Sequence, residues 1–128
     1  MEFRLGELFC GPGGIAYGAT TATIENPAFK ILHKWATDYD KDTCATYAHN
    51  ICNAKKNSVV CKDIRNLQIE KLGEIDALAF GFPCNDYSVV GEQKGIDGVY
   101  GPLYSYGIKT LEIYKPQWFL AENVGGVA

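Results

Sequence analysis

The chain has 128 residues and a formal net charge of −3, and 47% of its residues are hydrophobic while 21% are charged. This composition indicates one globular domain with a real core, and it excludes a membrane-spanning protein because no apolar run approaches the roughly 18 residues that a span needs. The negative charge is unfavourable for nucleic-acid binding, so either the partner is not a nucleic acid or the basic surface lies outside this chain.

Cysteine usage and the N-terminus indicate a reducing compartment. The five cysteines are odd in number and include no C-x-x-C pair, which argues against a disulfide framework and against a zinc site. The charged N-terminus does not have the form of a signal peptide. We therefore expect a cytoplasmic or nucleoid-associated protein without a metal ion or a membrane partner.

Apolar runs alternate with turn residues along the chain. Strands are predicted at residues 3–9, 29–36, 58–61, 75–80 and 118–121, helices at 15–24, 40–50 and 102–114, and a weak helical turn at 64–72. Asp40 is the expected N-cap of the second helix, and Pro116 ends the third. Because strands that alternate with helices form parallel sheets, we expect a doubly wound, mostly parallel α/β fold that is truncated after its fifth strand.

The first strand leads into a glycine-rich turn, where Gly11, Gly13 and Ala16 satisfy the pattern G-x-G-x-x-[G/A]. Glycines at this place let a ligand approach the backbone, and the following helix offers unpaired N–H groups. The pattern alone does not separate a dinucleotide from an adenosyl cofactor. A tight turn that only packs the strand on the helix is the alternative.

Acidic residues follow the next two strands. Asp38 could hold the hydroxyls of a ribose, and Tyr39 could lie against an adenine. A helix cap and a surface tyrosine are an equally good interpretation of this pair. Asp63 could accept a hydrogen bond from the exocyclic amine of a base, although alone it is more typical of a turn or cap. The functional hypothesis depends on the recurrence of such turns at successive strand ends.

Cys84 and Glu122 follow the fourth and fifth strands. Ligands of open α/β sheets bind outside the carboxyl ends of the strands, so a thiol there is placed to act as a nucleophile. The apolar residues 119–121 predict a partly buried Glu122 carboxyl that can donate a proton. Together the two groups could attack an electron-poor ring and protonate it. A small buried cysteine and an exposed charge are the alternatives.

Taken in order, these turns resemble the first six motifs of the cytosine-C5 DNA methyltransferases. The likeness rests on residues 9–14, 38–39, 63–64, 81–88, 91–95 and 122–124, and it covers essentially the whole chain. It implies a Rossmann-like, S-adenosylmethionine-dependent methyltransferase fold, with residues 1–128 as the N-terminal portion of the catalytic domain. It also implies that the target cytosine is flipped out of the duplex, because the reacting ring atom is unreachable inside the stack. Transfer of the methyl group would convert S-adenosylmethionine into S-adenosylhomocysteine.

The resemblance assigns a role to each site residue. Cys84 would attack C6 of the cytosine and Glu122 would contact the N3 edge, after which C5 takes the methyl group. Pro83 would support the flipped base, and Asn123 would hold the loop that carries Glu122. The implied cofactor contacts are Phe9, Cys10, Gly11, Gly13, Gly14, Asp38, Tyr39, Asp63, Ile64 and Leu103, and the implied DNA contacts are Ser88 and Gln93 within a mobile loop at 86–95.

Two positions depart from the pattern of the resembled family. Asn85 stands where many members have glutamine, and Tyr100 stands where an arginine often precedes the Gly-x-Leu element. The target-recognition region and a segment that completes the cofactor pocket would follow Glu122, which would also explain the acidic charge. We therefore expect a chain that is inactive alone and binds duplex DNA only with its missing half or a complementing chain. The exposed edge of the last strand predicts self-association.

Three other functions stay open. An RNA-directed cytosine-C5 methyltransferase would share these motifs, although Tyr87 and Ser88 favour the DNA group. An NAD-dependent oxidoreductase would explain the glycine turn and Asp38 but would give no reason for Cys84 and Glu122. A non-catalytic subunit or fragment would use residues 118–121 as an apolar edge strand for pairing.

Overall fold

The computed structural model describes residues 1–22, 24–25, 28–51, 57–81 and 103–122. The strands are β1 (Glu2–Leu8), β2 (Ile24–Glu25), β3 (Ala28–Asp38), β4 (Val59–Cys61), β5 (Ala77–Gly81) and β6 (Trp118–Glu122). The α-helices are α1 (Gly14–Thr21), α2 (Lys41–Asn50) and α5 (Tyr104–Tyr114), and the 3₁₀ turns are η1 (Ile64–Asn66) and η2 (Ile69–Lys71).

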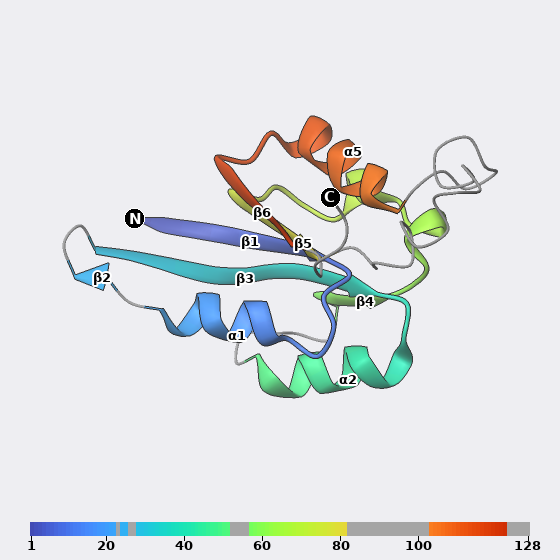
Figure 1. The fold of residues 1–128 in the computed structure, drawn as a ribbon, viewed down its shortest axis with the longest axis horizontal. Helices are drawn as coiled ribbons and strands as arrows, with labels where there is room; N and C mark the ends of the chain where they lie inside the picture. The colour runs from blue at the N-terminus through green and yellow to red at the C-terminus, as the bar shows by residue number, and fades with distance from the viewer. Residues whose placement is uncertain (23, 26–27, 52–56, 82–102, 123–128) are drawn as a thin grey trace.

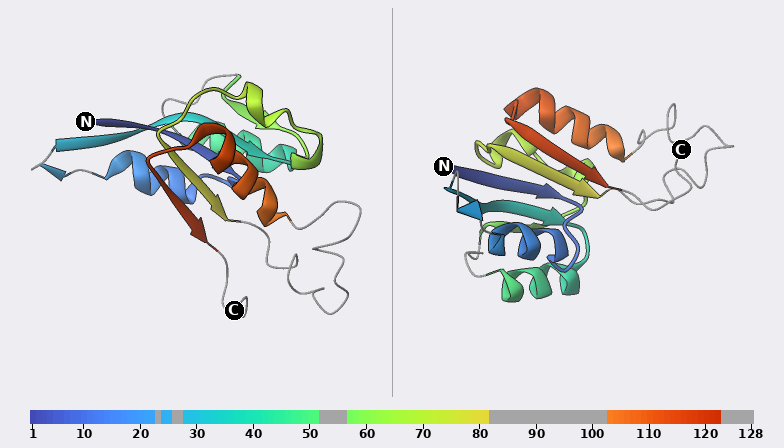
Figure 2. Two further views of the ribbon diagram at one scale, coloured as in Figure 1. Left: turned by 90° about the horizontal axis from the view of Figure 1, so that it is seen from above. Right: turned by 60° about the vertical axis from the view of Figure 1, so that its left-hand side comes forward.

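Five strands form a parallel sheet in the order β4-β3-β1-β5-β6. β2 pairs antiparallel with the start of β3. In Figure 1, α1 and α2 cover one face of this sheet and α5 covers the other, and the right-hand view of Figure 2 shows the same three layers. The doubly wound, mostly parallel fold predicted from the sequence is therefore confirmed.

The helix boundaries follow from local chemistry. Asp40 is the N-cap of α2, as expected, and its side chain accepts a hydrogen bond from the Thr43 N–H at 2.8 Å. α5 ends at Lys115, which adopts the left-handed conformation directly before Pro116. The first helix predicted at residues 15–24 is too long, because the backbone is already extended at Ala22 and Ile24 pairs with Phe29.

An irregularity in β3 changes which face its side chains occupy. Leu5 pairs with His33 while Gly6 pairs with Trp35, so Lys34 is an extra residue in the ladder. His33 lies on the α2 side, where it contacts Tyr47, whereas Trp35 lies on the α5 side, where its ring is 6.1 Å from that of Tyr114. A bulge of this kind reverses the alternation of inward and outward side chains from that point on.

The side chain of Trp35 requires a glycine on the neighbouring strand. A Cβ atom built on Gly6 would lie 2.6 Å from Cζ2 of the buried indole. We expect Gly6→Ala to lower the free energy of unfolding by about 1–3 kcal/mol, the usual cost of overpacking a core. Chemical denaturation measures this loss. Gly18→Ala is the matched control, because a Cβ there meets nothing within 4 Å and alanine favours a helix by up to about 1 kcal/mol.

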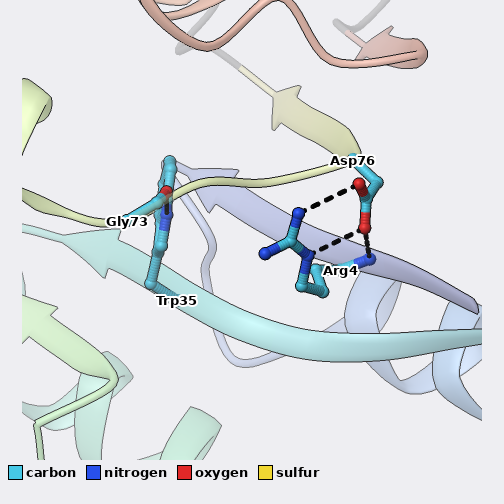
Figure 3. Close-up of polar contacts among 4 residues, drawn as sticks. All are labelled: Arg4, Trp35, Gly73 and Asp76. Atoms are coloured by element: carbon cyan, nitrogen blue, oxygen red, sulfur yellow. Dashed lines mark hydrogen bonds and ion pairs between the residues drawn. The ribbon is translucent and has the colours of Figure 1, made fainter.

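Two long-range contacts hold the segment before β5 against the sheet (Figure 3). Nε of Arg4 and its backbone N–H donate to Oδ2 of Asp76 at 2.9 and 2.8 Å, and the indole N–H of Trp35 donates to the Gly73 carbonyl at 2.9 Å. The hydrogen bonds from Arg4 lower the pKa of Asp76. These contacts hold the residues directly before β5 against β1 and β3.

β6 lies at one end of the strand order and pairs with β5. Phe119 and Leu120 are 55% and 48% exposed. The apolar edge strand expected from the sequence is therefore present in the described part of the chain. Its use for self-association stays a prediction.

Candidate active site

The carboxyl ends of the five parallel strands meet at one edge of the sheet. The strands β4, β3, β1, β5 and β6 end at Cys61, Asp38, Leu8, Gly81 and Glu122. The glycine-rich turn follows β1, the central strand, so it lies between the β3–β4 side and the β5–β6 side. This is the place where open α/β sheets bind ligands.

The turn has an unusual backbone. Phe9, Gly11 and Gly13 have φ angles of 54°, 61° and 104°, all in the left-handed region. This conformation is natural for glycine but costs energy for phenylalanine, and such outliers cluster at functional sites. The side chain of Phe9 packs on the core cluster of the α5 face.

The backbone of the turn is open on one side and packed on the other. A Cβ atom built on Gly11 or Gly14 would meet nothing within 4 Å, whereas one built on Gly13 would lie 3.3 Å from Cδ2 of Tyr47. Gly13 is the N-cap of α1. A ligand can therefore approach the turn at Gly11, Gly14 and the first N–H groups of α1, while α2 supports the turn from the opposite side.

Asp38 connects this turn to the end of β3. Its Oδ2 accepts a hydrogen bond from the Gly11 N–H at 3.0 Å, and its Oδ1 accepts one from the Asp40 N–H at 3.1 Å. The cap of α2 is Asp40, so the interpretation of Asp38 as the helix cap is wrong. Tyr39, the next residue, is 76% exposed. The structure thus brings an acidic group and a free aromatic face to the side of the turn.

Asp63 follows β4 and caps η1. Arg65 binds both of its carboxylate oxygens, through Nε at 2.9 Å and through Nη2 at 2.5 Å, and these bonds lower the pKa of Asp63 to about 2. Ile64 is buried in the α5-face cluster. Asp63 is therefore ionised and paired with Arg65 at this end of the site, and Ile64 offers backbone atoms.

Cys10 and Leu103 were also predicted to contact a cofactor. The side chain of Cys10 is buried with Ala16, Ala36, Tyr47 and Ile51. Burial raises the pKa of its thiol, so it remains a thiol at neutral pH. The side chain of Leu103 lies directly before α5 and packs against the α5-face cluster. The side chain of Cys10 therefore belongs to the core, while its backbone directly precedes Gly11 in the turn.

Glu122 and Gly81 meet on the other side of the turn. The two residues are register partners at the ends of β6 and β5. A Cβ atom built on Gly81 would collide with Oε2 of Glu122 and would lie 3.5 Å from its Cδ. The carboxylate therefore lies directly over the last residue of β5, which precedes Cys84 by three positions in the sequence.

The prediction that the carboxyl of Glu122 is partly buried is wrong, because the residue is exposed. Its apolar neighbours Phe119 and Leu120 belong to an edge strand and are themselves exposed. The remaining predicted site residues lie outside the described part of the chain: Pro83, Cys84, Ser88, Gln93 and Asn123.

Sequence reasoning missed the acidic residue inside β1. Glu7 is 2% exposed, and its Oε1 accepts a hydrogen bond from the hydroxyl of Tyr47 at 3.2 Å. Burial raises the pKa of Glu7 to about 7. The available sign was an acid between Leu5 and Leu8, directly before the glycine turn, because buried carboxyl groups are rare without a partner.

The sheet order, the helices on both faces and the open glycine turn are those of a Rossmann-like α/β methyltransferase fold. The crystal structure of the S. pombe Dnmt2 methyltransferase has the same fold, with a TM-score of 0.67 over 98% of this chain and 36% of that chain. The sequence identity between them is 18%, so this likeness concerns the fold alone.

Sequence comparisons identify the family. A model of the C-5 cytosine-specific DNA methylases matches residues 3–128. The type II methyltransferase M.BbvI of Brevibacillus brevis is 57% identical over 99% of this chain and 36% of its own length. M.PspPI of Psychrobacter sp. is 37% identical over 99% of this chain and 28% of its own length. The chain therefore belongs to the C-5 cytosine-specific DNA methylase family, and it spans about a third of the length of these relatives.

Membership of this family rules out the alternative that the chain is an NAD-dependent oxidoreductase.

Within the described ranges, the structure has no helix long and apolar enough to cross a bilayer. The same residues contain no group of three or more His, Cys, Asp or Glu side chains that could hold a metal ion.

Proposed function

We propose that this protein takes part in methylating C5 of cytosine in DNA, with S-adenosylmethionine as the methyl donor. The observation that carries the proposal is the position of the open glycine turn, which has Asp38 on one side and the Gly81–Glu122 pair on the other. An open turn and a carboxylate at the same edge of one sheet support a cofactor site beside a reacting group. Family membership gives the arrangement its chemistry.

The residues of the turn fit an adenosyl cofactor. The methionine part would lie along Phe9, Gly11, Gly13 and Gly14, where a Cβ at Gly11 or Gly14 would meet nothing. When bound, S-adenosylmethionine supplies an electrophilic methyl group. Asp38 would contact the ribose hydroxyls, Tyr39 the adenine face and Asp63 the adenine amine. The backbone of Cys10 and Ile64 and the side chain of Leu103 would make further contacts with the cofactor.

The proposed nucleophile is Cys84. Two residues separate it from Gly81, so three Cα-to-Cα steps bring its Cα no further than about 11 Å from that of Gly81, over which the Glu122 carboxylate lies. The thiolate would form a bond to C6 while Glu122 gives a proton to N3, which makes C5 nucleophilic towards the methyl group. Loss of the C5 proton to solvent water, expulsion of the thiolate and return of the N3 proton to Glu122 would then restore the ring.

The other assignments are proposals of the same kind. Pro83 would support the flipped cytosine, Asn123 would hold the backbone that carries Glu122, and Ser88 and Gln93 would contact DNA. We propose that duplex DNA binds when this chain is joined or complemented by further residues, and that the protein is cytoplasmic or nucleoid-associated. Its acidic net charge of −3 supports a DNA surface that is largely elsewhere.

A chimera tests the proposed function. This chain would replace the matching segment of the Brevibacillus brevis relative, to which it is 57% identical. We expect the chimera to form a covalent adduct with duplex DNA that contains 5-fluorocytosine, because fluorine at C5 blocks the proton loss that releases the thiol. Cys84→Ser should abolish the adduct, and Cys61→Ser, at an exposed cysteine on β4, should leave it unchanged.

Three outcomes would contradict the proposal. An adduct that survives Cys84→Ser would give the nucleophile another identity. A folded chimera that forms no adduct and binds no S-adenosylmethionine would remove the cofactor assignment. An adduct with 5-fluorocytosine RNA but not with DNA would favour the RNA-directed alternative.

The edge strand β6 leads to a separate proposal about assembly. Phe119 and Leu120 are exposed on a strand whose described partner is β5 alone. We expect the isolated chain to self-associate at micromolar concentration, because an apolar edge strand pairs readily with another. Sedimentation velocity measures the oligomeric state of the chain at this concentration. Leu120→Lys should shift the protein towards monomer, and a strictly monomeric wild type would contradict the proposal.

A further inference from the structure

A chain of buried polar groups runs beneath the glycine turn. The hydroxyl of Tyr47, on α2, lies 3.2 Å from Oε1 of Glu7 and 3.1 Å from Nδ1 of His33. The other ring nitrogen of His33, Nε2, lies 2.8 Å from Oγ of Ser58. Glu7 and Tyr47 are both fully buried. The four side chains therefore form one continuous hydrogen-bonded series from β1 through α2 and β3 to the residue before β4.

The hydrogen-bond chemistry gives this series a direction. Burial lowers the pKa of His33, so its ring is neutral at pH 7 and carries one N–H. The hydroxyl of Tyr47 has one proton, and a Glu7 carboxylate can only accept. Tyr47 therefore donates to Glu7, Nδ1 of His33 donates to Tyr47, and Nε2 accepts from Ser58. Hydrogen bonds that all point the same way strengthen one another.

The series supports the turn directly. Cδ2 of Tyr47 is 3.3 Å from the position that a Cβ would take on Gly13, so the ring fills the space under this residue. Asn50, one turn further along α2, donates from Nδ2 to the Pro12 carbonyl at 3.2 Å. α2 thus holds the turn at two successive residues, and Tyr47 joins that support to Glu7.

The charge of Glu7 changes near neutrality. Burial raises its pKa to about 7, and the hydrogen bond from Tyr47 partly opposes this rise. The groups that face Glu7 are the Tyr47 hydroxyl and the Cys10 thiol, and the charges of Glu7 and Asp38 both contribute to the raised pKa of Cys10. His33 lies beyond Tyr47. Glu7 is therefore a buried group of this layer that changes its charge around pH 7.

We propose that Glu7, acting through Tyr47, is a positioning residue for the glycine turn, and that its ionised form holds the turn in the geometry that binds the cofactor. The inference rests on the proposed function, because it takes S-adenosylmethionine as the ligand. Ionised Glu7 keeps the directional series intact. Its negative charge in a poorly polarisable interior also favours a ligand with a positive sulfonium group.

The test combines a pH titration with a binding titration. Backbone NMR would follow the Gly13 amide of the full chain from pH 5.5 to 8.5, without ligand and with S-adenosylmethionine. We expect the wild-type amide to move with a midpoint near pH 7, and the Kd to fall about fivefold or more as Glu7 ionises, the lower end of typical coupling between sites. Both effects should vanish in Glu7→Gln and persist in Glu2→Gln, an exposed residue of β1.

Tyr47→Phe provides a second variant should Glu7→Gln unfold. It retains the ring under Gly13 and removes the hydroxyl, so the Gly13 amide should lose its pH response. A response that persists in both variants, or a Kd that is independent of pH in the wild type, would overturn the inference and leave the proposed function intact. If neither the folded chain nor its chimera with the Brevibacillus brevis relative binds S-adenosylmethionine at any pH, the proposed cofactor site is refuted, and the inference with it.

Discussion

Tyr114→Phe is expected to lower the free energy of unfolding by about 2–4 kcal/mol, although it removes a single oxygen atom. The hydroxyl of Tyr114 donates to the Ile69 carbonyl at 2.6 Å and accepts from the N–H groups of Leu72 and Gly73, both at 3.1 Å. Without this oxygen, the Gly73 N–H loses its partner, and the Leu72 N–H and the Ile69 carbonyl keep only the 3.1 Å hydrogen bond between them. Each loss costs about 1–3 kcal/mol before the turn relaxes.

Urea denaturation of Tyr114→Phe beside Tyr17→Phe measures this loss. Tyr17 lies on α1 and is 59% exposed, so its variant should differ from the wild type by less than about 0.5 kcal/mol. A Tyr114→Phe protein as stable as this control would mean that the segment 69–73 is held by other contacts. The hydrogen bond from Trp35 to the Gly73 carbonyl would then be the first one to examine.

Local patterns in the sequence predict most of this fold. Asp40 caps α2 because a short acidic side chain can reach the Thr43 N–H, and this relation involves four consecutive residues. The strand-end rule likewise predicts that the turn at Gly11, Asp38 and Glu122 share one edge of the sheet, because all these strands are parallel. Such relations need only the order of the elements.

Features that depend on distant residues were not predictable in the same way. The burial of Glu7 depends on Tyr47, forty residues later, and nothing in β1 announces that partner. The extra residue Lys34 moves Trp35 to the α5 face, whereas simple alternation would have left it with His33. The exposure of Glu122 depends on the place of β6 in the strand order, not on its apolar neighbours.

Glu122→Gln is expected to reduce adduct formation with 5-fluorocytosine DNA by about 10²- to 10⁴-fold in the chimera, the usual range for loss of a positioned general acid. Glutamine retains the shape of the side chain and its ability to contact N3, but it cannot give N3 a proton. Glu112→Gln is the matched control, because it makes the same charge change on an exposed position of α5. Single-turnover rates of adduct formation compare the two variants.

Gly81→Ala distinguishes a catalytic carboxylate from an ordinary surface charge. The new Cβ would come closer to Oε2 of Glu122 than two unbonded atoms allow, so the carboxylate must shift from its position over the end of β5. We expect a loss of adduct formation of about 10²-fold, because small displacements of catalytic groups carry such costs. The melting temperature should change little, since the displaced group is exposed. A Gly81→Ala chimera with the wild-type rate would show that the observed position of Glu122 has no part in the reaction.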